Sequence, residues 1–125
     1  MRSIIIIDDN SDYRLSIIEI LSLENYELLE AENGEAGLNL IRLRSPDLIL
    51  CDVDMPLTSG VEVLGIVKTD PEFRNIPFII ITGRSEKRTQ KICHDLGVDL
   101  YLIKPVSIIE LISSIFQLLN SSDFA

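Results

Sequence analysis

The sequence contains only two cysteines and no long apolar run, and each scarcity excludes a class of protein. Cys51 and Cys93 stand far apart, in no CxxC motif and without a histidine at ligand spacing, so neither a disulfide framework nor a thiolate metal site is indicated. We expect both thiols to be small apolar side chains of a core. The apolar run 4–7 is too short for a signal peptide, and nothing approaches the ~20 residues of a membrane span. We therefore expect a cytoplasmic protein with no membrane segment.

Basic residues are also scarce, since 11 lysines and arginines stand against 20 acidic residues, which gives a net charge of -9. Nucleic-acid backbones are bound by clustered lysine and arginine, so direct nucleic-acid binding is not expected. Cations or basic protein surfaces suit such a chain better as ligands. With 125 residues, 46% of them hydrophobic, the chain is long enough for one globular domain with its own core.

Short apolar runs alternate with segments of helical periodicity along the whole chain. Strands are predicted over 3–7, 26–31, 47–52, 77–82 and 99–103, and helices over 11–23, 34–44, 60–69, 85–96 and 107–120. Strands that are apolar throughout are typical of a parallel sheet covered by helices on both faces. The pattern therefore predicts a single doubly wound α/β domain over 1–125, with its ligand site beyond the carboxyl ends of the strands.

Polar and charged side chains stand at those strand ends: Asp8, Asp9, Asp52, Thr82 and Lys104. Taken singly, they have simpler explanations, as solvated loop acids, a capping threonine and a Lys-Pro turn. Together, three crowded carboxylates would raise one another's pKa values unless they shared a cation, and oxygen ligands of this kind suit Mg²⁺. A carboxylate nucleophile beside a hydroxyl and an ammonium is what phosphoryl transfer to an aspartate requires.

These motifs resemble those of response-regulator receiver domains, and the similarity covers essentially the whole chain. The residues that carry it are Asp8 and Asp9, the run Asp-Val-Asp-Met-Pro over 52–56, Gly60, Thr82, Gly83, Tyr101, Lys104 and Pro105. The resemblance implies a flavodoxin-like sandwich of five β-α units with the strand order 2-1-3-4-5. It also implies a signalling switch with self-phosphorylation and auto-dephosphorylation chemistry, and not an enzyme in the ordinary sense.

By the same resemblance, Asp52 is the phosphoacceptor. Thr82 and Lys104 bind the phosphoryl oxygens, and Tyr101 moves inward with Thr82 as the switch. Mg²⁺, or Mn²⁺ in its place, would be held by the carboxylates of Asp8, Asp9 and Asp52 and by the backbone carbonyl of Asp54.

A receiver domain takes its phosphoryl group from a histidine kinase or a phosphotransfer protein. We expect this donor to dock on the helix 11–23 and on the turn after the last strand, at Tyr13, Ile17, Pro105 and Val106. Leu15 and Ile18 on that helix are apolar residues beyond those that a core stripe needs. A downstream protein or a second copy would bind the face formed by 85–96, 99–103 and 107–120. We expect the chain to be a stand-alone receiver or the N-terminal part of a longer regulator.

Two positions depart from the family pattern, and two others flank the expected site. Gly83 stands where the family most often has alanine, and Val106 where phenylalanine is common. Asp54 and Arg84 lie two residues beyond the acceptor and beyond Thr82. We expect them to pair across the entrance and to set the lifetime of the phosphorylated form, although an exposed ion pair of little effect is equally open.

Two other readings and one surface feature stay open. A small phosphatase with an aspartate nucleophile would use Asp54 as its acid, but such enzymes need cap segments for which 125 residues leave little room. A receiver-like interaction module that is never phosphorylated is the second alternative. A basic cluster, made of Arg84, Lys87, Arg88 and Lys91, is either a solvated face or a contact for an acidic partner or a second copy.

Overall fold

A computed structural model describes residues 1–120 of the chain, so the last five residues of the predicted domain lie outside the described part. The five strands are β1 Arg2–Ile7, β2 Tyr26–Ala31, β3 Leu48–Cys51, β4 Phe78–Thr82 and β5 Leu100–Ile103. They form one parallel sheet in the order β2-β1-β3-β4-β5. The flavodoxin-like fold and the strand order expected from the sequence are therefore confirmed.

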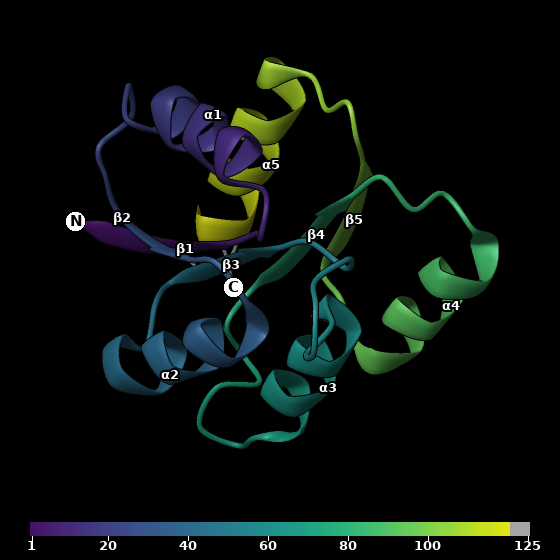
Figure 1. The fold of residues 1–125 in the computed structure, drawn as a ribbon. Coiled ribbons are helices and arrows are strands. Elements are labelled where there is room, and N and C mark those ends of the chain that lie inside the picture. Colours follow the sequence, from purple (N-terminus) through teal and green to yellow (C-terminus); the bar gives the residue numbers. More distant parts are fainter. Residues whose placement is uncertain (121–125) are drawn as a thin grey trace.

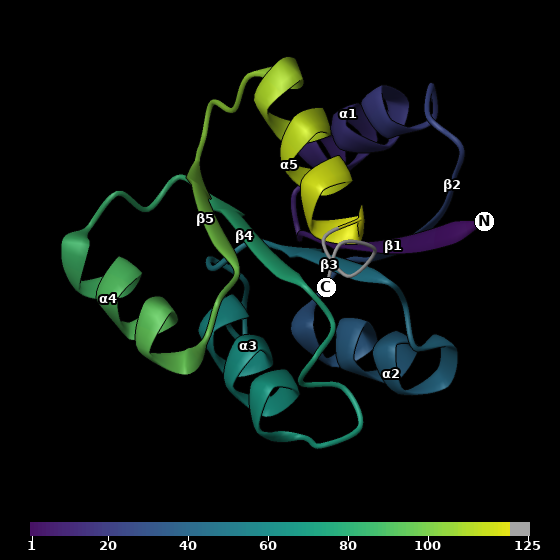
Figure 2. The same ribbon diagram turned by 180° about the vertical axis from the view of Figure 1, so that it is seen from behind.

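Five helices cover the two faces of this sheet. They are α1 Ser11–Leu21, α2 Gly34–Arg44, α3 Gly60–Thr69, α4 Lys87–Leu96 and α5 Ile108–Asn120. Helices α1 and α5 lie on one face, and α2, α3 and α4 lie on the other (Figure 1, Figure 2). None of the helices in residues 1–120 has the length and apolar composition needed to cross a membrane.

The sheet is apolar on both faces because each face has its own core. Along β1, Ile4 and Ile6 pack into the core with α1 and α5, while Ile5 and Ile7 pack into the core on the opposite face. Successive side chains of a strand point to opposite faces, so a strand buried on both sides must be apolar at every position. Burying each such side chain contributes roughly 1.5–3 kcal/mol. This rigid sheet holds the loops at its carboxyl edge.

Two predicted helix bounds are wrong by two residues, and every other bound lies within one residue of the observed one. The helix predicted over 11–23 ends at Leu21, where the N–H of Glu24 donates to the Leu21 carbonyl and turns the chain. The helix predicted over 85–96 begins at Lys87, because Glu86 has an extended backbone and its carbonyl accepts the first helical bond. Residues 84–86 thus belong to the loop above the site.

Side-chain caps anchor the loops at the carboxyl edge of the sheet. The Asn10 side chain accepts a hydrogen bond from the N–H of Tyr13 at 3.0 Å and starts α1. Ser59 and Glu62 form a reciprocal capping box at the start of α3. The Ser107 hydroxyl accepts from the backbone of α5 in the same way. The loops after β1, β3 and β5 are therefore anchored to the helices that follow them, whereas the start of α4 has no side-chain cap.

Candidate functional site

Three aspartates meet at the carboxyl ends of β1 and β3. One oxygen each from Asp8, Asp9 and Asp52 lies within 4.8 Å of the others, and this is the only acidic, histidine or cysteine group of its kind in residues 1–120. Asp8 is 3% exposed and Asp52 7% exposed, whereas Asp9 faces solvent. The acceptor expected from the sequence is thus a nearly buried carboxylate beside a second one.

Lys104 reaches into this group from the end of β5. Its Nζ lies 3.1 Å from Oδ2 of Asp52 and 3.2 Å from Oδ2 of Asp8. Its backbone N–H donates to the carbonyl of Thr82 at 2.8 Å, which ties the ends of β5 and β4 together. The ammonium therefore bridges the two buried carboxylates.

Burial and charge oppose each other at these groups. Burial raises the pKa of Asp8, as does the neighbouring Asp52, although the Asn10 N–H and Lys104 act the other way. Burial alone would lower the pKa of Lys104, but the Asp52 and Asp8 carboxylates outweigh it and the net shift is upward. Lys104 is thus a cation at neutral pH and cannot by itself neutralise three carboxylates.

The donor set at this edge fits a divalent cation that prefers oxygen. Mg²⁺ typically binds through one or two carboxylates and keeps several waters, and the exposed carboxylate of Asp9 leaves the group open on its solvent side. The backbone N–H of Asp54 donates to Oδ1 of Asp52 at 3.2 Å, so the loop after Asp52 turns back towards the Asp52 carboxylate. The Asp54 carbonyl as a further ligand stays a prediction.

Thr82 and Tyr101 lie on the neighbouring strands. Thr82 ends β4 and is fully buried, and its hydroxyl accepts from the N–H of Arg84 at 3.4 Å. Tyr101 packs its ring against the core on the α3 and α4 side, and its hydroxyl donates to the Arg84 carbonyl at 2.8 Å. Burial raises the pKa of Tyr101 to about 12, so this hydroxyl keeps its proton. Both residues thus contact the same loop.

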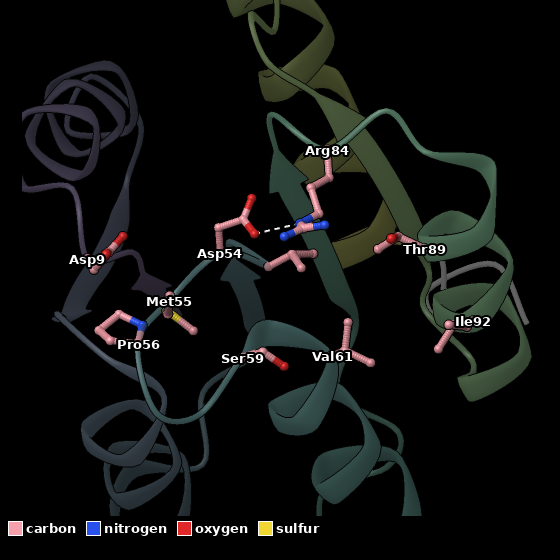
Figure 3. Close-up of a pocket in the computed structure, with 10 residues that line it drawn as sticks. Asp9, Asp54, Met55, Pro56, Ser59, Val61, Arg84, Thr89 and Ile92 are labelled. Atoms are coloured by element: carbon pink, nitrogen blue, oxygen red, sulfur yellow. Dashed lines mark hydrogen bonds and ion pairs between the residues drawn. The ribbon is translucent and has the colours of Figure 1, made fainter.

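Asp54 and Arg84 form an ion pair at the edge of the site. Nε of Arg84 lies 2.5 Å from Oδ1 of Asp54, and both side chains are exposed (Figure 3). They line an open pocket of about 550 Å³ that extends from Asp9 to Val61 on α3 and Ile92 on α4. Both side chains therefore lie at a pocket that Asp9 also lines, while an effect of the pair on any rate stays a prediction.

The predicted docking residues are only partly accessible. Ile17 is 4% exposed and packs in the core with α1 and α5, so the expectation that it contacts a donor is wrong. Its helical spacing had already placed it on the buried stripe of α1. Tyr13 is half-buried and Val106 partly so, whereas Pro105 is exposed.

The sequence reasoning missed three features around the site. The ring centroid of Tyr13 lies 4.0 Å from Nζ of Lys104. Arg14 donates to the Asp8 carbonyl at 2.6 Å and pairs with Glu30, which holds the loop after β1. Leu57, after the acceptor, is 99% exposed with a positive φ of 67°, a conformation unusual for a branched side chain. Only the positions of these residues next to the motifs could have drawn attention to them.

The doubly wound sheet and the acidic edge with its lysine together define a receiver domain of two-component signalling. The model of the response regulator receiver domain family matches residues 4–116, so this chain belongs to that family. The resemblance drawn from the sequence motifs is therefore confirmed.

Named relatives agree with this assignment. The chain is 32% identical over 121 residues to the polar-differentiation response regulator DivK of Brucella anthropi. This alignment covers 97% of this chain and 98% of that protein. A CheY-like response regulator receiver domain protein of Methanospirillum hungatei superposes with a TM-score of 0.92 at 27% identity, over 98% of this chain and 97% of that one. The receiver domain of a signal transduction histidine kinase of Syntrophus aciditrophicus gives 0.91 at 29% identity, over 97% and 92%.

Proposed function

We propose that this receiver domain is a Mg²⁺-dependent phosphorylation switch in which Asp52 accepts a phosphoryl group from a phosphohistidine of a histidine kinase or a phosphotransfer protein. The observation that carries the proposal is the pairing of the nearly buried Asp52 with Lys104 inside a group of three aspartates. The ammonium of Lys104, and a cation held by the neighbouring acids, would stabilise the additional negative charge that Asp52 carries once it is phosphorylated.

In the proposed transfer, a carboxylate oxygen of Asp52 attacks the phosphorus and forms the new O–P bond. The P–N bond of the donor breaks, and its electron pair returns to the imidazole of the donor. Lys104 and Thr82 donate hydrogen bonds to the oxygens of the transferred group. A bound Mg²⁺ or Mn²⁺, held by Asp8, Asp9, Asp52 and the Asp54 carbonyl, would neutralise the charge that gathers there.

The phosphorylated form would be hydrolysed when water attacks the phosphorus of the acyl phosphate. The O–P bond to Asp52 breaks, inorganic phosphate leaves, and the Asp52 carboxylate is restored. The ion pair between Asp54 and Arg84 stands at the edge of the route that this water would take. We infer that the pair lengthens the lifetime of the acyl phosphate by narrowing that route.

The output would follow from the loop between β4 and α4. When Thr82 turns towards the phosphoryl group, the hydrogen bond that its hydroxyl accepts from the Arg84 N–H would change. The Tyr101 hydroxyl donates to the carbonyl of the same Arg84. The two side chains thus couple the site to α4 and β5, where Ile92 and Ile103 are exposed. We propose this α4-β5-α5 face as the contact for a downstream protein or a second copy.

The donor would approach the same edge of the sheet from the side of α1 and the turn after β5. Pro105 is exposed there, and Leu15 of α1 is 54% exposed, so both are candidates for the contact with the donor. Ile17 is not a candidate, because it is buried. The proposal places the protein in the cytoplasm, because the two cysteines are free and buried, as in a reducing compartment.

Incubation with Mg²⁺ and phosphoramidate, followed by intact mass, tests the proposal. Wild-type protein should gain one phosphoryl group, Asp52→Asn should gain none, and the control Asp95→Asn, at an exposed site on α4, should behave as wild type. No gain in wild type, with phosphoramidate or with a phosphorylated phosphotransfer protein, would refute the switch. A gain that persists in Asp52→Asn would mean that another residue is the acceptor. Continuous turnover of a small phosphate ester would favour a phosphatase instead.

A further inference from the structure

The aromatic ring of Tyr13 lies directly against the ammonium of Lys104. The distance from Nζ to the ring centroid is 4.0 Å, within the range of a cation–π contact. The other side-chain partners of this ammonium are Oδ2 of Asp52 at 3.1 Å and Oδ2 of Asp8 at 3.2 Å. The ring thus covers a side of the ammonium that the carboxylates leave free.

The ring differs from these partners in one respect that matters for the proposed reaction. Asp8 and Asp52 are both proposed ligands of the metal ion, so a bound cation would compete with Lys104 for their oxygens. Among the side chains of residues 1–120 that hydrogen-bond to the Lys104 ammonium or stack on it, Tyr13 is the one without a negative charge. It can therefore hold the ammonium without taking part in that competition.

Tyr13 is itself firmly placed. Its backbone N–H donates to the side-chain oxygen of Asn10, and its ring packs against the core with α1 and α5. A cavity of about 10 Å³ is lined in part by Tyr13, Asp8, Asp52 and Ile17. That volume is at or below the size that one water needs, so these side chains leave little room for solvent between them.

A lysine side chain needs such a support. Its four-carbon stem has considerable rotational freedom, and its compact ammonium has no preferred plane of approach. We propose that Tyr13 is a positioning residue for phosphoryl transfer, with its ring face keeping the ammonium of Lys104 beside Asp52. This role rests on the proposed function. The docking role that the sequence suggested for Tyr13 stays a separate prediction.

Two substitutions separate the ring from the hydroxyl. Tyr13→Phe keeps an aromatic face, while Tyr13→Leu keeps an apolar side chain without one; Tyr13→Met serves if the leucine protein does not fold. Tyr26→Leu is the matched control, because Tyr26 is a half-buried tyrosine of the same core that starts β2, away from the carboxyl edge. Urea unfolding of all variants, followed by circular dichroism, shows that each rate is measured on folded protein.

The first measurement is the chemical shift of the Lys104 ε-protons without metal or phosphodonor. The chain has four lysines, so lysine-labelled protein gives few signals, and a Lys104→Arg protein assigns the one of interest. A proton above an aromatic face is shifted upfield by the ring current. We expect that shift in wild type, Tyr13→Phe and Tyr26→Leu, and its loss in Tyr13→Leu.

The second measurement is the rate of phosphorylation by phosphoramidate at saturating Mg²⁺. Tyr13→Phe and Tyr26→Leu should react at the wild-type rate, and Tyr13→Leu should be slower by roughly three- to tenfold, as the usual strength of a cation–π contact implies. A wild-type rate in Tyr13→Leu, or an equal fall in Tyr13→Phe, would overturn the positioning role while the switch itself stands. Wild type that gains no phosphoryl group would instead overturn the proposed function, and this role with it.

Discussion

Gly60, the first residue of α3, is packed against the backbone of Asp52 and Val53, which we call the acceptor segment after the proposed acceptor Asp52. A Cβ built at this position would lie 2.0 Å from the carbonyl oxygen of Asp52 and 2.9 Å from Cα of Val53. The N–H of Gly60 also donates to the Val53 carbonyl at 2.9 Å. The neighbours are backbone atoms, which cannot turn aside as a flexible side chain could. We therefore predict that Gly60→Ala forces the acceptor segment and α3 apart.

The cost follows from the size of the displacement. Overpacking a well-packed region typically costs 1–3 kcal/mol, and loosening the hydrogen bond to Val53 adds about 1 kcal/mol. We expect Gly60→Ala to lower the free energy of unfolding by about 3 kcal/mol, which corresponds to a fall of about 10 °C in Tm for a domain of this size. The folded variant should also be phosphorylated more slowly, because the backbone of Asp52 has moved.

The control lies in the same helix. A Cβ at Gly65 would meet only the methyl groups of Leu96 at 3.9–4.0 Å, which is ordinary contact. Gly65→Ala should therefore raise stability by about 0.5–1 kcal/mol, as usual for an alanine inside a helix, and leave phosphorylation unchanged. Urea unfolding followed by circular dichroism measures both variants, since the chain has no tryptophan. A Gly60→Ala protein as stable as wild type would refute the steric argument.

Three further predictions concern charges at the site. Arg84→Ala and Asp54→Ala should each lose the phosphoryl group roughly two- to fivefold faster than wild type, by intact mass over time, and equal lifetimes would contradict the entrance role. Lys104→Met should bind Mg²⁺ at least roughly threefold more tightly than wild type, because the ammonium competes for the same carboxylates. Isothermal titration calorimetry measures the affinity, and weaker binding than in wild type would contradict the prediction. Asp8→Asn should unfold at higher urea than wild type at pH 7. Burial raises the pKa of Asp8, so the folded state binds the carboxyl proton more tightly than the unfolded state does. Wild type therefore loses stability as the pH rises above the ordinary pKa of 3.8, and the stabilities of the two proteins should converge below that pH. A difference in stability that widens in acid would contradict this prediction.

Most of the fold was predictable from the sequence because burial on both faces leaves a strong signal. A run such as that of β1, with Ile4 to Ile7 apolar at each position, has few interpretations once helices alternate with it. The convergence of Asp8, Asp52 and Lys104 was predictable for a topological reason, since parallel strands bring their carboxyl ends to one edge. Neither inference needed the side chains to be placed individually.

The errors arose where a local pattern had two readings. Ser85 suggested a helix start, but the first helical bond runs to the carbonyl of Glu86, and no side-chain cap marks this end. Ile17 was predicted as a docking residue, although its helical spacing places it on the buried stripe of α1. Of the two surplus apolar residues on this helix, Leu15 is exposed, whereas Ile18 packs partly against the same core.

The contact between Tyr13 and Lys104 lay beyond any sequence pattern for a different reason. It joins the first turn of α1 to the end of β5, and nothing in either motif indicates which of the aromatic side chains meets the ammonium. An ammonium held only by carboxylates would lose those partners whenever a metal ion bound the same oxygens. A neutral aromatic ring does not compete with the metal ion, and Tyr13 is the ring that contacts this ammonium in residues 1–120.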